Sequence, residues 1–197
     1  YIKNNELDYP ETAVRVKDGN FYWMTEEEKQ LKQKKEENEE GGEKKETGQE
    51  AASGSEVSEN EKPIIKGLNL EIKKGSSVAI LGDVGSGKSS FLFSLVGEMR
   101  ASENISPPEI VINGDISHVP QQSWIMNATV KNNILFGNEF DQKRYDEALK
   151  YSCLEADLNI LINKDETEIG EKGINLSGGQ KARVSLARAL YKNSDIY

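Results

Sequence analysis

The chain of 197 residues is long enough for one domain with a sizeable hydrophobic core. Its formal net charge is −9, and most of that charge lies between residues 26 and 61, where 13 Glu stand against 6 Lys. The sequence holds no basic stripe with interleaved aromatic residues, which argues against nucleic acid as a partner. It also holds no apolar run near the roughly 20 residues that cross a bilayer. With Cys153 as the single cysteine, no disulfide can form within the chain.

The N-terminal part is predicted to form short strands. Apolar and polar residues alternate between Ala13 and Trp23, and the run Asp18-Gly19-Asn20 interrupts the alternation. This pattern predicts two short strands or a hairpin that turns at the interruption. Because the chain begins at Tyr1 rather than Met and shows no signal peptide, we expect it to be an excised part of a longer polypeptide.

The acidic segment from Glu26 to Glu61 is of low complexity and contains few large apolar side chains. Such a segment cannot bury enough surface to offset its ordering entropy, so we predict that it is disordered. A long insertion inside a compact domain is uncommon and is usually functional or regulatory.

The rest of the chain alternates predicted strands with predicted helices. Short apolar runs predict strands at residues 68–72, 77–81, 109–112 and 116–119, and the beginning of another at 195–197. Apolar residues at helical spacing predict helices at 88–99, 129–135, 141–154 and 178–191. This alternation predicts an α/β domain.

A glycine-rich loop lies between the predicted strand at 77–81 and the predicted helix at 88–99. It matches the pattern G-x-x-x-x-G-K-[ST] and reads Gly82-Asp83-Val84-Gly85-Ser86-Gly87-Lys88-Ser89. Glycines let backbone N–H groups approach phosphates closely, and the helix N-terminus adds a positive dipole. Lys88 would place a cation on the β- and γ-phosphates, Ser89 would offer a hydroxyl to Mg²⁺, and Ser90 would add a phosphate contact. The loop predicts nucleotide binding, but by itself it does not separate kinases, GTPases and transport ATPases.

A second motif, Leu176-Ser177-Gly178-Gly179-Gln180, opens the last predicted helix. A serine and two glycines at a helix start form an anion-binding corner. With both motifs the chain resembles the ABC transporters over nearly all of its length except the acidic segment. The resemblance implies a P-loop NTPase fold of the ABC ATPase type, with a mainly parallel core sheet, N-terminal antiparallel strands and a helical subdomain that carries the signature.

In that family two nucleotide-binding domains pack head to tail, so the signature of one covers the γ-phosphate held by the other. The resemblance therefore implies that Ser177, Gly178, Gly179 and Gln180 contact ATP on a partner domain. It also implies a division of the chain into N-terminal strands (1–25), an acidic insertion (26–61), a P-loop core (62–122), a helical subdomain (123–180), and the signature helix with the beginning of the Walker B strand (181–197).

Three further residues match functional positions of the family. Trp23 falls where an aromatic ring stacks on adenine, although Trp23 and Phe21 could both be core residues. Gln121 matches the glutamine that reaches Mg²⁺ and the attacking water, with Gln122 as the competing candidate. Phe136 matches a residue that docks under a coupling helix of the transmembrane domains, and the alternative is again a core position.

The wording of the motifs resembles the first nucleotide-binding domain of the C subfamily, which includes multidrug-resistance-associated exporters and the cystic fibrosis channel. The implied function is an ATP- and Mg²⁺-binding domain of an exporter, on the cytosolic face of a membrane. Two alternatives remain open: a weakly hydrolysing regulatory domain that gates a channel or receptor-like protein, and a soluble ABC protein. Because the Walker B aspartate and the catalytic carboxylate of the family would follow residue 197, we expect the chain alone not to hydrolyse ATP.

Overall fold

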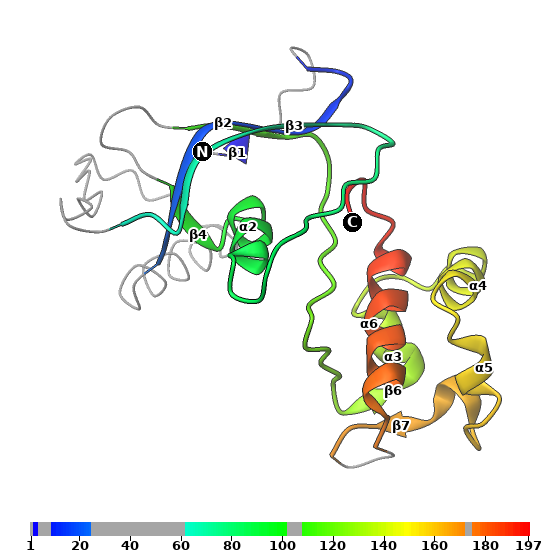
Figure 1. The fold of residues 1–197 in the computed structure, drawn as a ribbon. Coiled ribbons are helices and arrows are strands. Elements are labelled where there is room, and N and C mark those ends of the chain that lie inside the picture. The colour runs from blue at the N-terminus through cyan, green and yellow to red at the C-terminus, as the bar shows by residue number, and fades with distance from the viewer. Residues whose placement is uncertain (1, 4–8, 25–61, 102–107, 172–174) are drawn as a thin grey trace, which may run out of the picture. The chain divides into compact units, whose positions relative to one another are not determined.

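The computed structural model describes residues 2–3, 9–24, 62–101, 108–171 and 175–197. The chain divides into two compact units, Tyr1–Asn113 and Gly114–Tyr197. Figure 1 shows a sheet with helix α2 in the first unit and mainly helices in the second. The insertion that the sequence predicts to be disordered, residues 26–61, lies outside the described residues.

The sheet of the first unit is mostly antiparallel and is organised around its longest strand, β2. Its strands are β1 (Ile2–Lys3), β2 (Thr12–Trp23), β3 (Ile65–Lys73), β4 (Met99–Ala101) and β5 (Glu109–Ile112). The strand order is β1-β5-β2-β3, and β4 also pairs with β2. β2 is antiparallel to β3, β4 and β5, whereas β1 is parallel to β5.

The hairpin predicted at residues 18–20 is wrong, because β2 runs through this segment as one strand with a bulge. Asp18 has a left-handed backbone (φ 53°), and the register with β3 shifts on both sides of Gly19. β2 nevertheless keeps β3 as its neighbour, with Val16 opposite Leu70 before the bulge and Phe21 opposite Ile65 after it. A Cβ at Gly19 would lie 2.6 Å from the Phe21 ring, so the glycine makes room for this core side chain.

Buried side chains from β2, β4 and β5 form the core of the first unit. They alternate along β2 as a half-buried strand requires, and the largest contributions come from Val14, Val16, Phe21, Met99, Ile110, Val111 and Ile112. Burial of each large side chain contributes about 1.5–3 kcal/mol. Helix α2 (Lys88–Leu95) lies beside β4 (Figure 1). It ends before the predicted residue 99 because Gly97 has a positive φ (78°) that breaks the helix.

The mainly parallel core sheet that we predicted is not formed by the described residues. The segment 77–81 is irregular, and Val78 and Leu81 are exposed. A strand requires a neighbour to complete its ladder of hydrogen bonds, and no described strand pairs with this segment. The predicted strand at 116–119 is reduced to one parallel bridge between Ile116 and Ile196. The described architecture is mixed α/β with mostly antiparallel pairing.

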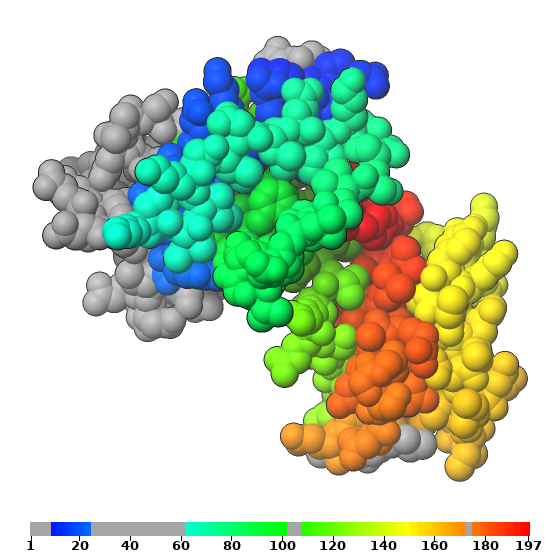
Figure 2. Space-filling model, in the orientation of Figure 1, coloured from blue at the N-terminus to red at the C-terminus, as the bar shows by residue number. Residues whose placement is uncertain are grey.

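The second unit is built from helices around one hydrophobic cluster. Its elements are β6 (Ala128–Thr129), α3 (Val130–Leu135), α4 (Gln142–Tyr151), α5 (Glu155–Leu158), the 3-10 helix η1 (Lys164–Glu166), β7 (Glu168–Ile169) and α6 (Gly178–Lys192). β6 and β7 pair as a two-stranded antiparallel sheet. The surface of α4 and α5 lies directly against that of α6 (Figure 2). The fully buried side chains include Val130, Ile134, Leu154, Ile169, Val184 and Tyr191.

The helices predicted in this unit are present, with small differences at their ends. α4 stops at Tyr151 rather than residue 154, because Cys153 adopts a left-handed backbone (φ 57°) that cannot continue the helix. In the part of the chain that the structure describes, no helix combines the length and apolar character needed to cross a membrane.

Candidate functional site

The phosphate loop is shaped by its backbone. A turn closes where the N–H of Ser86 donates to the carbonyl of Asp83 (3.2 Å). Gly85 and Gly87 both have left-handed backbones, with φ of 84° and 91°. A Cβ at either position would meet no atom within 4 Å, so a side chain would not clash there. Glycine is favoured at both positions because of the left-handed backbone.

The Lys88 side chain folds back over this loop. Its ammonium group donates to the carbonyl oxygens of Gly82 (2.9 Å) and Asp83 (2.7 Å). A Cβ at Gly82 would lie 2.6 Å from the Ser86 hydroxyl, so a side chain there would push into the loop. The loop therefore holds a cation among its own backbone groups.

The N-terminus of α2 carries backbone donors without a side-chain cap. Gly87 occupies the N-cap position and makes no side-chain hydrogen bond. The first backbone hydrogen bond of the helix runs from the N–H of Phe91 to the carbonyl of Gly87 (2.9 Å). The N–H groups of residues 88–90 precede it and have no acceptor in the helix ladder, an arrangement that suits an anion. The side chain of Ser89 is exposed at the same turn.

Trp23 lies in the same unit as the phosphate loop and contacts its helix. Its ring packs on Phe93 of α2, with ring centroids 5.7 Å apart and an interplanar angle of 59°. Phe21 is 1% exposed and belongs to the core, whereas Trp23 is 44% exposed. Trp23 is therefore not a buried core residue, in contrast to Phe21.

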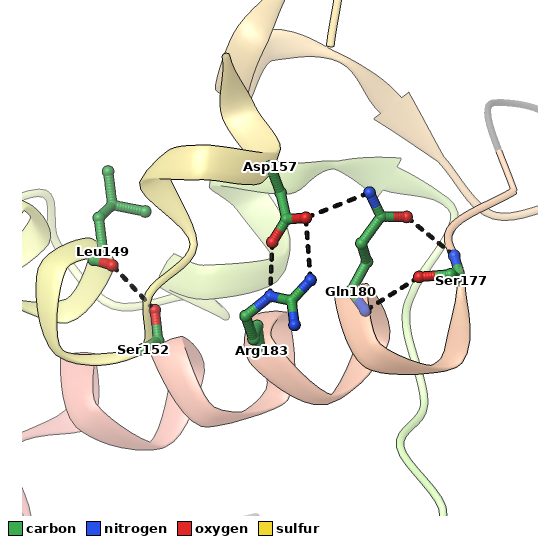
Figure 3. A network of polar contacts seen from close by, with 6 residues as sticks. All are labelled: Leu149, Ser152, Asp157, Ser177, Gln180 and Arg183. Atoms are coloured by element: carbon green, nitrogen blue, oxygen red, sulfur yellow. Dashed lines mark hydrogen bonds and ion pairs between the residues drawn. The ribbon is translucent and has the colours of Figure 1, made fainter. Parts of the chain in front are cut away.

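The signature motif begins α6 with a capping box (Figure 3). The Ser177 hydroxyl accepts from the Gln180 N–H (3.3 Å), and the Gln180 side-chain oxygen accepts from the Ser177 N–H (2.9 Å). The amide nitrogen of Gln180 donates to Asp157 (3.3 Å). Both ends of the Gln180 amide are therefore engaged within the chain, while Ser177, Gly178 and Gly179 are exposed.

Sequence reasoning missed the residue at the centre of this network. Asp157 on α5 is 8% exposed and accepts two hydrogen bonds from Arg183 of α6, at 2.5 and 2.9 Å. These bonds lower the pKa of the Asp157 carboxyl below its ordinary value, with Gln180 assisting and burial opposing. The signal was present, since Asp157 lies between Leu154 and Leu158 at i, i+3, i+4 spacing, which placed a carboxylate on an apolar helix face.

Gln121 and Gln122 are both exposed in the irregular segment after Ile116. The structure therefore does not choose between the two glutamines. Among the described residues, no group of three or more His, Cys, Asp or Glu side chains is arranged to hold a metal ion.

Phe136 is half-exposed (48%) and ends α3 with a left-handed backbone. Its ring meets the ring of Trp124 edge-on, with centroids 5.6 Å apart. The guanidinium group of Arg188 lies 4.0 Å from the Trp124 centroid and 5.2 Å from the Phe136 centroid. These three side chains form an exposed aromatic–cation patch, which we call the aromatic patch.

The side chain of Arg188 is held in place by Asn133, which is fully buried. The Arg188 guanidinium group donates to the backbone carbonyl (2.7 Å) and to the side-chain oxygen (3.1 Å) of Asn133. The Asn133 amide in turn bonds to the backbone of Met126 and Thr129. Burial lowers the pKa of Arg188. The aromatic patch is thus tied to α6, the helix that begins at the signature.

Comparison with known proteins agrees with these motifs. The sequence profile of the family described as "ABC transporter" matches residues 65–197. The chain is 55% identical over 139 residues to "ABC transporter C family member 8" of Dictyostelium discoideum, covering 71% of this chain and 8% of that protein. It is 55% identical over 133 residues to "ATP-binding cassette sub-family C member 2" of Homo sapiens, and 53% identical over 133 residues to "Multidrug resistance protein mrp-7" of Caenorhabditis elegans. Each of these two matches covers 68% of this chain and 8% of the relative.

The chain thus spans only about 8% of the length of these curated relatives. The matched residues include the phosphate loop and the signature at the N-termini of α2 and α6. The chain therefore belongs to the ABC transporter family, as a nucleotide-binding domain of the kind found in the C subfamily.

Proposed function

We propose that this domain binds Mg²⁺–ATP at the N-terminus of α2 and couples its binding and hydrolysis to transport by a C-subfamily exporter. The observation that carries the proposal is the Lys88 ammonium held at 2.7–2.9 Å by two loop carbonyls, next to the uncapped N–H groups of α2. An ammonium has three N–H donors, and two are used within the loop. The third is available to a phosphate oxygen.

The remaining contacts of the nucleotide follow from the loop and its neighbours. Backbone N–H groups of residue 85 and residues 87–90 surround the phosphates, and the Ser90 hydroxyl adds a contact. Ser89 would supply an oxygen ligand to Mg²⁺, which would neutralise phosphate charge when bound. The family's glutamine that reaches Mg²⁺ and orients the attacking water corresponds to Gln121. The exposed ring of Trp23 stacks on the adenine.

The signature at α6 faces ATP held by a second nucleotide-binding domain packed head to tail. The Ser177 oxygen accepts from the Gln180 N–H, so its hydroxyl hydrogen is free to point toward a phosphate. Gly178 and Gly179 are exposed beside it and present backbone N–H groups at a helix N-terminus. Gln180 contributes by shaping this turn, because its side chain is engaged with Ser177 and Asp157.

The aromatic patch is the surface that meets the transmembrane domains of the same polypeptide, on the cytosolic face of the membrane. Trp124 and Phe136 are both about half-exposed, and Arg188 is held between their rings and Asn133. Aromatic and arginine side chains of this kind are enriched at the centres of protein interfaces. Because Arg188 belongs to α6, movement of this helix would displace the Arg188 guanidinium group relative to the rings of Trp124 and Phe136.

The test is ATP binding by the full-length protein carrying Lys88→Ala, with Lys73→Ala as the matched control. Lys73 is exposed at the end of β3 in the same unit, so both changes remove one positive charge. We expect Lys88→Ala to weaken ATP binding at least about tenfold, since charge-assisted hydrogen bonds to phosphate are lost. Lys73→Ala should bind as the wild type does. Full ATP affinity at this domain in Lys88→Ala would overturn the proposal.

A further inference from the structure

We propose that Asp157 is a positioning residue that holds the first turn of α6 in the form that accepts the partner's ATP. The inference rests on the function proposed for the signature. Asp157 itself lies on α5 and is largely buried, so its effect on nucleotide is transmitted through Gln180 and Arg183. Figure 3 shows the carboxylate of Asp157 between these two side chains, with Ser177 beyond Gln180.

The first step is the orientation of the Gln180 amide. An amide has a donor end and an acceptor end, and only one of its two orientations completes the capping box with the Ser177 N–H. An ionised carboxylate only accepts hydrogen bonds, so Asp157 must face the NH₂ end of Gln180 (3.3 Å). The carbonyl end is then directed to the Ser177 N–H (2.9 Å). Asp157 thereby selects the orientation that closes the cap.

The second step concerns charge. A carboxylate near an anion-binding helix N-terminus would repel phosphate unless it were neutralised. Arg183 pairs with both oxygens of Asp157 through two hydrogen bonds, at 2.5 and 2.9 Å. Such bidentate pairing fixes geometry as well as charge. The carboxylate can therefore orient Gln180 without opposing the phosphate at Ser177 and Gly178.

The third step concerns where along α6 the two partners of Asp157 lie. Gln180 and Arg183 lie three residues apart on the same side of α6, so α5 is joined to α6 on two successive turns of the helix. Of residues 177–179, Ser177 is bonded to Gln180, and Gly178 and Gly179 are exposed beside it. Loss of the carboxylate would release Gln180 and leave Arg183 with an unpaired charge next to the same turn.

The experiment measures amide hydrogen exchange in the full-length protein with and without ATP, for the wild type, Asp157→Asn and Asp146→Asn. Asp146 is a matched control because it is an exposed aspartate on α4 that also accepts from a glutamine, Gln142 (2.9 Å). In the wild type, ATP should slow exchange over residues 82–90 and over 176–181. We expect Asp157→Asn to reduce the slowing at 176–181 by about tenfold, as for loss of hydrogen bonds to a charged group. The slowing at 82–90 should stay unchanged.

Each outcome decides the question. Wild-type protection at 176–181 in Asp157→Asn would overturn the positioning role, as would an equal loss in Asp146→Asn. A loss of ATP-dependent slowing at 176–181 no larger than the loss of protection across 130–134 and 184–191 would show that Asp157 only stabilises the unit, which also overturns it. If ATP slowed exchange at 82–90 but not at 176–181 in the wild type, the signature would not contact ATP and the inference would fall. If ATP slowed neither segment, the proposed ATP site itself would fail.

Discussion

Two helices of this chain begin at sequences that favour phosphate contact, and their first turns are built differently. α2 follows Gly87, an N-cap with a left-handed backbone and no side-chain cap. α6 follows Ser177, which closes a capping box with Gln180. α2 has 8 residues and buries Ser94 and Leu95, whereas α6 has 15 residues and buries Val184, Ser185, Ala187, Ala189 and Tyr191.

The difference shows two ways of presenting N–H groups to an anion. At α2 the backbone shapes the turn, and Lys88, whose ammonium group donates to the loop carbonyls of Gly82 and Asp83, supplies the cation that we propose for the phosphates. At α6 the turn is held by the capping box and by Asp157 of α5, and the positive charge of Arg183 is paired with the Asp157 carboxylate. We infer that the first turn is a site that grips a nucleotide and the second a surface set in place to cover one.

The largest expected effect concerns the anchoring of α6. Arg188→Ala would remove two hydrogen bonds to Asn133 and the contact with Trp124. A buried carbonyl left without a partner, together with the lost cation–π contact, should lower the free energy of opening α3 and α6 by about 2–4 kcal/mol. Native-state hydrogen exchange of residues 130–134 and 184–191 measures this change.

Arg188→Lys is the control for charge. Lysine keeps the positive charge but loses the planar fork and the stacking surface, so it should restore less than half of the lost stability. A change below about 0.5 kcal/mol in Arg188→Ala, the range of ordinary surface substitutions, would mean that the aromatic patch is not tied to α6.

The next effect compares the glycines that open the two helices. Gly87→Ala would force alanine into a left-handed backbone (φ 91°), at a cost of about 1–2 kcal/mol, so ATP affinity should fall about tenfold. Gly178 has no positive φ and open space around a Cβ, so Gly178→Ala should leave ATP affinity at the phosphate loop unchanged. Equal losses of ATP affinity in both variants would contradict the distinction between a backbone-shaped and a side-chain-shaped turn.

The sequence predicted local structure well where local physics decides it. Apolar spacing predicted helices at 88–99, 129–135, 141–154 and 178–191 and strands at 68–72 and 109–112. Each overlaps a described helix or strand (α2, α3, α4, α6, β3 and β5), because periodic burial determines both. The motif at Gly82–Ser89 predicted a turn before a helix, and the positive φ values of Gly85 and Gly87 give the reason. The start of α6 was predicted from Ser177 and the two glycines after it, and Ser177 is the N-cap of this helix.

The predictions that failed depended on distant partners. Asp18-Gly19-Asn20 has the composition of a turn, but pairing of β2 with β3 on both sides of Gly19 converts it into a bulge. The segment 77–81 is apolar enough for a strand, yet without a paired neighbour it remains irregular. The spacing of Asp157 placed a carboxylate on an apolar helix face, but its pairing with Arg183 could not be predicted, because the two residues are 26 positions apart and only the fold brings them together.

A smaller effect is expected from the cap of α6. Ser177→Ala would remove the acceptor of the Gln180 N–H while leaving Asp157 and Arg183 in place. N-cap substitutions of this kind cost about 1 kcal/mol, so exchange over residues 178–181 should accelerate several-fold. Thr129→Ala on α3 is the positive control, because the Thr129 hydroxyl accepts from the Asn132 N–H (3.1 Å). Acceleration on α3 but not on α6 would show that the capping box is held by Gln180 and Asp157 alone.

The smallest effect is a dependence of stability on pH that only the side-chain-shaped turn should show. Hydrogen bonds from Arg183 and Gln180 lower the pKa of Asp157 below its ordinary value of 3.8. A carboxyl with a depressed pKa in the folded state stabilises the fold above its unfolded pKa, and this contribution is lost as the pH falls through the folded value. The difference in urea midpoint between the wild type and Asp157→Asn should therefore be constant from pH 6 to 5 and shrink below pH 4.

Asp146→Asn is the control, because it measures how the loss of an exposed carboxylate on α4 changes the urea midpoint over the same pH range. If the difference in urea midpoint stayed constant or widened toward acid pH, the charge of Asp157 would not be what holds α5 to α6. The physical basis for distinguishing the first turns of α2 and α6 would then be lost.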